Sequence, residues 1–276
     1  GESWELSGMP GSESVVAEGP WAGSTLSELI GRFGAELLGK ANYARFGQEF
    51  PLLVKFIDAR EDLSIQVHPD DELARKRHGK SGKCEMWYVL EAEPGASLLT
   101  GFSRPIAPAE YERRVADNTL TDVLNRQAIA SGDVFYLPAG RVHSIGKGSF
   151  IVEIQQSSDI TYRIYDFDRR DAAGNSRELH TELAREAIDF ESSENSRITY
   201  APENNQEVRL VTTPYFTTSL YTLTARTRCD WSATDSFVAI VLLQGSGSLT
   251  DNEGNRIDVR QGETWLLPAS TQWTEI

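Results

Sequence analysis

Cysteine is scarce in this chain of 276 residues, which contains only Cys84 and Cys229. The two cysteines lie far apart and form no Cys-x-x-Cys pattern, so we expect neither a disulfide framework nor a thiolate zinc site. The sequence also lacks any run of about 18 apolar residues, which excludes a transmembrane helix. Its first residues, GESWELSGMPGSE, have neither the basic nor the apolar segment of a signal peptide. Together these absences predict a cytoplasmic protein with no membrane partner.

Positive charge is in deficit, because 27 lysines and arginines are outnumbered by 41 aspartates and glutamates. The net charge is −14 and the pI is about 4.8, which disfavours non-specific binding to nucleic acid. A small anionic substrate stays possible, since a local basic pocket can lie within an acidic protein. The hydrophobic content of 39% is typical of a globular protein. We therefore expect a small-molecule partner and no nucleic acid, while the sequence carries no signal for the oligomeric state.

From residue 50 onward, short apolar or alternating runs dominate the chain and are separated by glycine, proline and aspartate. Such runs predict strands of a sandwich or barrel, so the fold class should be mainly β. Helices are expected at 24–39, with Ser24 or Thr25 as the N-cap, and also at 107–128 and 181–190. We accordingly interpret the chain as β-barrel units with inserted helices.

A repeat divides the chain. The segment GDVFYLPAGRVH (132–143) matches GETWLLPASTQW (262–273), which begins 130 residues later. Both have a glycine, an acidic residue, four mostly apolar residues and then Pro-Ala, which indicates two copies of one barrel unit. Because Trp273 replaces His143 in the second copy, that copy is expected to hold no metal. The expected organisation is a metal-binding unit, a connector and a second, degenerate unit, at 1–170, 171–206 and 207–276.

One strand candidate, LSIQVHPDDE (63–72), carries polar side chains on one face and ends at a proline. Residues i and i+2 of a strand face the same way, so Gln66 and His68 project together. Lys83 and Glu85 do the same in the run KCEMWYVL. A buried charge without a partner is costly, so these groups are expected to line a polar pocket.

The chain has four histidines, and two of them occur in contexts that suit a metal site. His68 ends a strand, and His143 follows a proline and glycine turn that aims its ring. His78 lies in a basic run that we expect to be a solvated loop, and His180 lies in the polar connector. Any single histidine could equally be a hydrogen-bonded core or surface residue, so the joint pattern carries the prediction. Two imidazoles, a carboxylate and an amide oxygen suit Zn²⁺, and would also suit Fe²⁺, Mn²⁺ or Ni²⁺.

These segments resemble a known family. The spacing from Gly132 through Pro138 and Gly140 to His143 is similar to the second cupin motif. The segment SIQVHPDD followed by GKCEMWYVL resembles the modified first motif of the type I mannose-6-phosphate isomerases. GESWE and TYRIYDFDR resemble further segments of the short bacterial form of that family. The resemblance covers nearly the whole chain, and it implies two cupin units with the jelly-roll fold.

The resemblance also implies an activity and a site. The activity is a zinc-dependent interconversion of mannose 6-phosphate and fructose 6-phosphate. One metal ion per chain would be held by four residues, Gln66, His68, Glu85 and His143. Catalytic roles would fall on Arg163 and Lys83. The residues whose positions match the substrate site are Ser64, Glu153 and Asp159. A phosphate needs cations or backbone amides around it, so a lysine of the HGKSGK segment, Lys80 or Lys83, is a further candidate.

Several alternatives remain open at this point. Arg163 would stabilise oxyanions, and Lys83 is expected to have a lowered pKa and to transfer protons, although a metal-assisted hydride shift is a rival mechanism. Glu85 could instead be a salt-bridge partner of Lys83, and Arg163 could pair with Asp166 or Asp168. The whole protein could be a metal-dependent cupin oxygenase or a non-catalytic sugar-phosphate-binding cupin. The cations near the expected metal favour an anionic sugar substrate over an oxygenase.

Overall fold

Strands make up most of the regular structure in the computed structural model, which describes residues 1–191 and 195–276. The prediction of a mainly β fold is confirmed. Among the described residues, every helix is too short or too polar to cross a membrane.

The chain forms two compact units. The first comprises residues 1–3 and 54–199, and the second comprises residues 4–53 and 200–276. Contacts thus group residues 4–53 with the C-terminal part of the chain, whereas the division drawn from the sequence placed them with the metal-binding unit.

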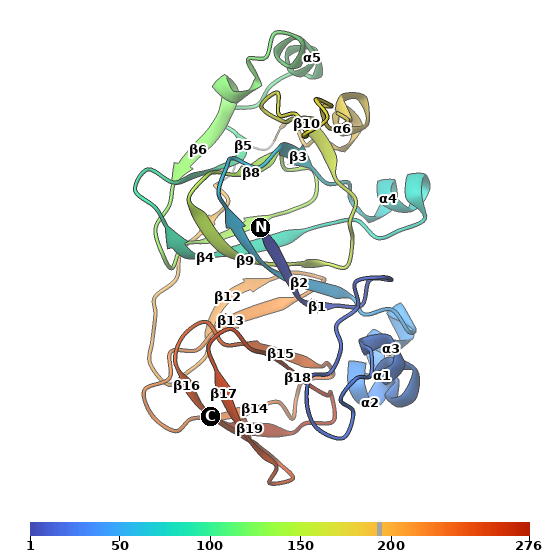
Figure 1. The fold of residues 1–276 in the computed structure, drawn as a ribbon, viewed down its shortest axis with the longest axis vertical. Coiled ribbons are helices and arrows are strands. Elements are labelled where there is room, and N and C mark those ends of the chain that lie inside the picture. The colour runs from blue at the N-terminus through green and yellow to red at the C-terminus, as the bar shows by residue number, and fades with distance from the viewer. Residues whose placement is uncertain (192–194) are drawn as a thin grey trace. The chain divides into compact units, whose positions relative to one another are not determined.

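The first unit is built on two sheets (Figure 1). Strands β3 (Ile65–Val67), β4 (Glu85–Ala92) and β5 (Ser97–Phe102) each pair in antiparallel fashion with both of their neighbours. The larger sheet has the order β1 (Glu2–Ser7), β2 (Leu52–Ala59), β9 (Ser149–Gln156), β4 (Glu85–Ala92), β7 (Val134–Leu137) and β11 (Arg197–Ile198). The smaller sheet has the order β10 (Tyr162–Tyr165), β3 (Ile65–Val67), β8 (His143–Ile145), β5 (Ser97–Phe102) and β6 (Leu124–Ala128).

The second unit contains smaller sheets, drawn in orange and red in Figure 1. A four-stranded sheet has the order β14 (Arg228–Asp230), β19 (Trp273–Glu275), β16 (Ser246–Asp251) and β17 (Arg256–Arg260). Two further pairs are formed by β12 (Val208–Thr212) with β13 (Thr217–Leu220), and by β15 (Val238–Val241) with β18 (Thr264–Leu267). A small apolar core of Leu249, Val259 and Leu267 lies among these strands.

The sequence repeat coincides with the same strands in each unit. β7 and β18 occupy matching positions of the repeat, and so do β8 and β19. β8 pairs with β3, which sets Gln66 opposite His143. In the second unit β19 pairs with β14, which sets Asp230 opposite Trp273. The two units therefore repeat a local arrangement of strands as well as a sequence motif.

The expected helix at 24–39 is interrupted. α1 (Leu26–Phe33) begins with a capping box, in which the Thr25 side chain accepts from the Glu28 backbone N–H and the Glu28 carboxylate accepts from the Thr25 N–H. The helix ends at Gly34, whose φ of 50° is readily adopted by glycine. The chain then continues as α2 (Ala35–Leu38) and α3 (Lys40–Phe46).

The basic run around His78 is helical, so its interpretation as a solvated loop was wrong. Asp70 accepts a hydrogen bond from the backbone of Leu73 and caps α4 (Asp71–His78). The basic residues fill the last turn, where positive charge is favourable beside the helix C-terminus. His78 itself contacts the hydroxyl of Tyr162 at 2.8 Å.

The region expected to be helical at 107–128 has a mixed structure. It forms α5 (Pro108–Ala116) and the 3₁₀ turn η1 (Leu120–Val123), but it ends in strand β6. Leu98 and Leu99 of β5 lie opposite the strand residues Gln127 and Arg126. Pairing with β5 therefore overrides the polar, helix-like composition of this segment. The expected helix at 181–190 is present as α6 (Thr181–Ala187).

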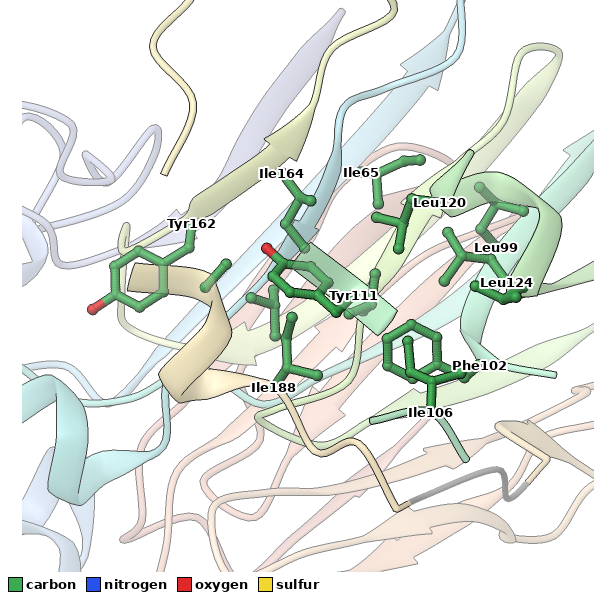
Figure 2. Packing of buried hydrophobic residues seen from close by; sticks show 14 of the residues in the cluster. Ile65, Leu99, Phe102, Ile106, Tyr111, Leu120, Leu124, Tyr162, Ile164 and Ile188 are labelled. Atoms are coloured by element: carbon green, nitrogen blue, oxygen red, sulfur yellow. The ribbon is translucent and has the colours of Figure 1, made fainter. Parts of the chain in front are cut away.

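An apolar core is packed between helices α5 and α6 and the smaller sheet of the first unit. Figure 2 shows Tyr162 and Ile164 of β10 together with Tyr111 of α5 and Ile188 after α6. Ile65 and Val67 of β3 belong to the same cluster. Because side chains alternate along a strand, the residues between them, Gln66 in β3 and Arg163 in β10, point to the opposite face.

Candidate metal centre

Polar residues gather at one end of the interior of the first unit. Four strands each place an apolar residue in one buried cluster, namely Ile57, Trp87, Ile145 and Ile151. Two positions away on the same face, each of these strands carries a polar residue. These residues are Lys55, Glu85, His143 and Glu153, and all of them are buried.

The two histidines expected to bind metal are each oriented by a backbone carbonyl. Nδ1 of His68 lies 2.7 Å from the carbonyl oxygen of Ile160, and Nδ1 of His143 lies 2.8 Å from that of Arg141. A carbonyl can only accept, so each ring carries its proton on Nδ1 and leaves Nε2 as a lone-pair donor. This is the usual way in which a metal-ligating histidine is fixed.

Both Nε2 atoms point at one carboxylate. Nε2 of His143 lies 3.2 Å from Oε1 of Glu85, and Nε2 of His68 lies 3.5 Å from Oε2. The candidate ligand atoms of the three residues all lie within 4.8 Å of one another. Zinc bonds of about 2.0–2.2 Å at tetrahedral angles place ligand atoms about 3.3–3.6 Å apart. Nε2 of His68 is buried without a hydrogen-bond partner, so these residues fit a single bound ion.

The electrostatic environment keeps both rings neutral. Burial lowers the pKa of His68 well below its usual value, and the nearby charge of Lys83 lowers it further. Burial also lowers the pKa of His143, although Glu85 opposes this shift. A neutral imidazole is the form that binds a metal ion. The two histidines are therefore ready to act as ligands without first losing a proton at neutral pH.

Gln66, the fourth expected ligand, contacts one of these three residues, His143. Its amide nitrogen is 3.4 Å from Nε2 of His143. The hydroxyl of Ser64 donates to Oε1 of Gln66 at 3.3 Å, so the predicted substrate-site serine is buried beside the same amide. Rotation of the Gln66 amide group exchanges its oxygen and nitrogen without changing the shape of the side chain, so either atom can face His143.

Lys83 forms ion pairs with two buried carboxylates. Its Nζ lies 2.8 Å from Oε2 of Glu85 and 3.6 Å from Oε1 of Glu153. Burial by itself lowers the pKa of Lys83, but Glu153 and Glu85 outweigh it, and the pKa is raised. The expected lowering of this pKa beside a zinc ion stays a prediction, and the second carboxylate, Glu153, opposes it. The salt bridge between Glu85 and Lys83 coexists with the contacts of Glu85 to the histidines.

Lys55 was missed by the sequence analysis. Its Nζ lies 3.2 Å from Oε1 of Glu153, and the indole N–H of Trp87 donates to Oε2 of Glu153 at 3.0 Å. The charges of Lys83 and Lys55 lower the pKa of Glu153 in spite of its burial. The sequence signal that could have indicated this site is the single lysine inside the apolar run PLLVKFID. A buried charge is costly without a partner, so such a lysine predicts a buried carboxylate nearby.

Arg163 lies in the same row of residues as the candidate ligands. It is opposite Gln66 in the β10–β3 pair, and Gln66 is opposite His143 in the β3–β8 pair. Its Nε is buried without a hydrogen-bond partner, while Nη1 donates to the carbonyl of Glu178 at 3.0 Å. Burial lowers the pKa of Arg163, and the charge of Arg177 lowers it further.

Lys80 and Asp159, two of the residues predicted to bind substrate, pair with each other. Nζ of Lys80 lies 2.9 Å from Oδ1 of Asp159, and each side chain is about half exposed. Asp159 directly precedes Ile160, whose carbonyl orients His68. The structure thus gathers the other predicted site residues in the interior and leaves this pair at the surface.

Comparison with known proteins identifies relatives along nearly the whole chain. The family described as "Phosphomannose isomerase type I, catalytic domain" matches residues 1–100. The mannose-6-phosphate isomerase of Streptococcus mutans is 35% identical over 97% of this chain and 82% of its own length. Mannose-6-phosphate isomerase ManA of Bacillus subtilis is also 35% identical, over 97% of this chain and 83% of its own length.

Solved structures agree with this relationship. The crystal structure of the mannose 6-phosphate isomerase from Bacillus subtilis superposes with a TM-score of 0.88 at 31% identity, covering 100% of this chain and 86% of that one. A mutant of phosphomannose isomerase from Salmonella typhimurium superposes with a TM-score of 0.75 at 17% identity, over 99% of this chain and 87% of that one, which shows the shared fold alone. By sequence and by structure, this chain belongs to the type I phosphomannose isomerase family of enzymes.

Proposed function

We propose that this chain is a zinc-dependent isomerase that interconverts mannose 6-phosphate and fructose 6-phosphate in the cytoplasm. The observation that carries the proposal is the convergence of His68, Glu85 and His143 on one point, beside the buried cation of Lys83. The names of the relatives supply the reaction, and the donor set supports a borderline metal such as zinc. Gln66 would supply the fourth ligand through its amide oxygen, once that oxygen faces His143.

Isomerisation moves a hydrogen between C1 and C2 of the sugar, and it passes through a state with negative charge on both oxygens if the intermediate is an enediolate. Bound zinc would supply Lewis-acid polarisation of these oxygens. The guanidinium of Arg163 stays charged and presents several donors in a plane, which suits a developing oxyanion. Nζ of Lys83, which lies 2.8 Å from Oε2 of Glu85, would donate a hydrogen bond or a proton to a substrate oxygen.

The phosphate group would be bound by residues around the polar end of the first unit. Ser64 offers a buried hydroxyl beside Gln66. Lys80 would exchange its exposed ion pair with Asp159 for the phosphate, which costs little because a solvated pair contributes little stability. Glu153 would hold Lys83 in place and need not touch the sugar.

A coupled assay tests the reaction. Purified protein loaded with one zinc ion per chain is expected to produce fructose 6-phosphate from mannose 6-phosphate, and a chelator is expected to abolish turnover until zinc is added back. Elemental analysis on the same samples relates activity to metal content. Absence of turnover by the zinc-loaded protein would reject the proposed function.

Two variants separate metal binding from chemistry. The substitution His143→Ala removes a ligand, so it is expected to lose both zinc and activity. The substitution Arg163→Ala leaves the ligands in place, so it should retain zinc and lose about 100-fold or more in kcat, as expected for a group that stabilises developing charge. Retention of full activity by both variants would show that the site has been placed wrongly.

A further inference from the structure

Arg163 is held through its backbone by His180, a residue 17 positions further along the chain. The backbone N–H of His180 donates to the carbonyl of Arg163 at 2.7 Å. In return, the backbone N–H of Arg163 donates to Nδ1 of the His180 ring at 3.1 Å. His180 directly precedes α6, so the two bonds connect the start of this helix to the middle of β10.

These bonds occupy the open side of an edge strand. β10 is the outermost strand of its sheet and has only β3 as a neighbour. Both backbone polar groups of a strand residue point to the same side, and those of Arg163 point to His180. The pair formed by Arg163 and Gln66 is therefore a non-hydrogen-bonded pair, the kind in which facing side chains approach most closely. His180 thus makes the two hydrogen bonds to the backbone of Arg163 that a neighbouring strand would otherwise make.

The segment before His180 also holds the side chain of Arg163. The carbonyl of Glu178 accepts from Nη1 of Arg163 at 3.0 Å. One residue earlier, the guanidinium of Arg177 binds both carboxylate oxygens of Asp166, with Nε donating to Oδ2 at 2.7 Å. Asp166 is 5% exposed and also accepts from Arg169. Residues 177–180 are therefore tied to β10 and to the turn after it by side-chain, carbonyl and backbone bonds.

We propose that His180 is a positioning residue for Arg163, and that its ring, accepting through Nδ1, fixes where the guanidinium lies relative to Gln66 and His143. This inference rests on the proposed function, in which Arg163 stabilises the oxyanion. A displacement of about 1 Å in such a group can cost about 100-fold in rate. Both hydrogen bonds between His180 and β10 run to Arg163 and not to a candidate ligand, so its loss should leave metal binding intact.

Two isosteric substitutions give a sharp test. In His180→Asn, the amide oxygen occupies the place of Nδ1 and can accept the same bond, whereas in His180→Gln the amide lies one carbon further out, near the place of Nε2. We expect the asparagine variant to keep kcat within about threefold and the glutamine variant to lose about 10- to 100-fold. The loss should appear equally in kcat and kcat/KM, because the interaction concerns the transition state. Zinc content and melting temperature are measured on both.

The substitution His78→Gln is the matched control, because His78 contacts the hydroxyl of Tyr162, the residue next to Arg163. This variant is expected to leave kcat unchanged. Equal kcat in the two His180 variants, with wild type active, would overturn the inference and leave the proposed function standing. An inactive zinc-loaded wild type would instead reject the proposed function and the inference with it. Nitrogen NMR of the His180 ring at pH 7.5 gives a separate readout, because a proton found on Nδ1 contradicts the inference whatever the activity.

Discussion

Nζ of Lys55 lies 3.2 Å from Oε1 of Glu153, and neither side chain is more than 11% exposed. The same carboxylate oxygen lies 3.6 Å from Nζ of Lys83. Glu153 thus shares its charge between two ammonium groups, and Lys83 shares its own charge between Glu153 and Glu85. This chain of alternating charges holds Nζ of Lys83 between Glu153 and Glu85.

The substitution Lys55→Met should disturb this balance. Glu153 would then be left with Lys83 as its only cationic partner and would attract it more strongly. We expect a loss of about 1–3 kcal/mol in the free energy of unfolding, because a buried carboxylate loses a partner. The value of kcat should fall at least tenfold while zinc content is unchanged. Urea unfolding, elemental analysis and the coupled assay measure these quantities.

The double variant Lys55→Met with Glu153→Gln provides the control. It removes the buried charge together with its partner, so stability should return toward that of the wild type. Activity should not return, since Lys83 no longer has its second carboxylate. Equal stability of the single and double variants would contradict this account.

Acid should destabilise the metal-free protein through His68 and His143. The folded state lowers the pKa of both groups below the ordinary value of 6.5, so the unfolded chain binds protons more readily than the folded chain. Stability therefore falls as the pH decreases through about 6.5 and continues to fall until the folded pKa is reached. Urea unfolding of the chelated protein between pH 8 and pH 5.5 measures this slope.

The variant His68→Gln tests the assignment of that slope. It removes one of the two titrating rings, so the decline of stability below pH 6.5 should be shallower than in the wild type. The substitution His78→Gln, at an exposed position of α4, is the control and should leave the slope unchanged. An identical pH profile in the wild type and in His68→Gln would mean that other groups cause the acid sensitivity.

The second unit should bind no metal even when its missing histidine is supplied. Glu85 lies opposite Leu137 in the first unit, and the matching Leu267 lies opposite Val238. The substitution Trp273→His therefore creates an imidazole with no carboxylate at the Glu85 position. We expect one zinc ion per chain in the wild type and in this variant, and none in His143→Ala. A second equivalent of zinc in Trp273→His would contradict the correspondence between the units.

Each candidate ligand is part of a local pattern that is visible in the sequence. Gln66 and His68 are two residues apart on a strand, and His143 follows a turn of proline and glycine. The spacing of such motifs is a short-range property, so it is visible without coordinates. Their convergence on Glu85 was supplied by resemblance to a family, and the structure gives the distances.

Long-range partners could not be predicted in this way. Lys55 was interpreted as part of an apolar strand because its partner Glu153 is almost 100 residues away. His180 was assigned to a polar connector, since nothing in its neighbourhood indicates that it would bond to Arg163. Strand β6 was expected to be helical because its composition is polar and its pairing with β5 is a tertiary effect.

The glycine before Lys83 should be required for activity. A Cβ atom on Gly82 would lie 2.4 Å from the carbonyl carbon of Asp70 and 2.6 Å from the backbone nitrogen of Asp71. Both neighbours are backbone atoms that cannot rotate away, so Gly82→Ala must displace the segment. The bond from the backbone N–H of Lys83 to the carbonyl of Pro69, 3.1 Å long, should be lost with it.

We expect Gly82→Ala to destabilise the protein by about 1–3 kcal/mol, as an overpacked site does. It should lower kcat at least tenfold, because Lys83 moves relative to Glu85. Gly31→Ala is the control, since Gly31 lies within α1 and a Cβ there would meet no atom within 4 Å. That variant should be stabilised by about 0.5–1 kcal/mol, the usual gain for alanine in a helix. Full kcat in Gly82→Ala would show that the position of Lys83 does not depend on this close backbone approach.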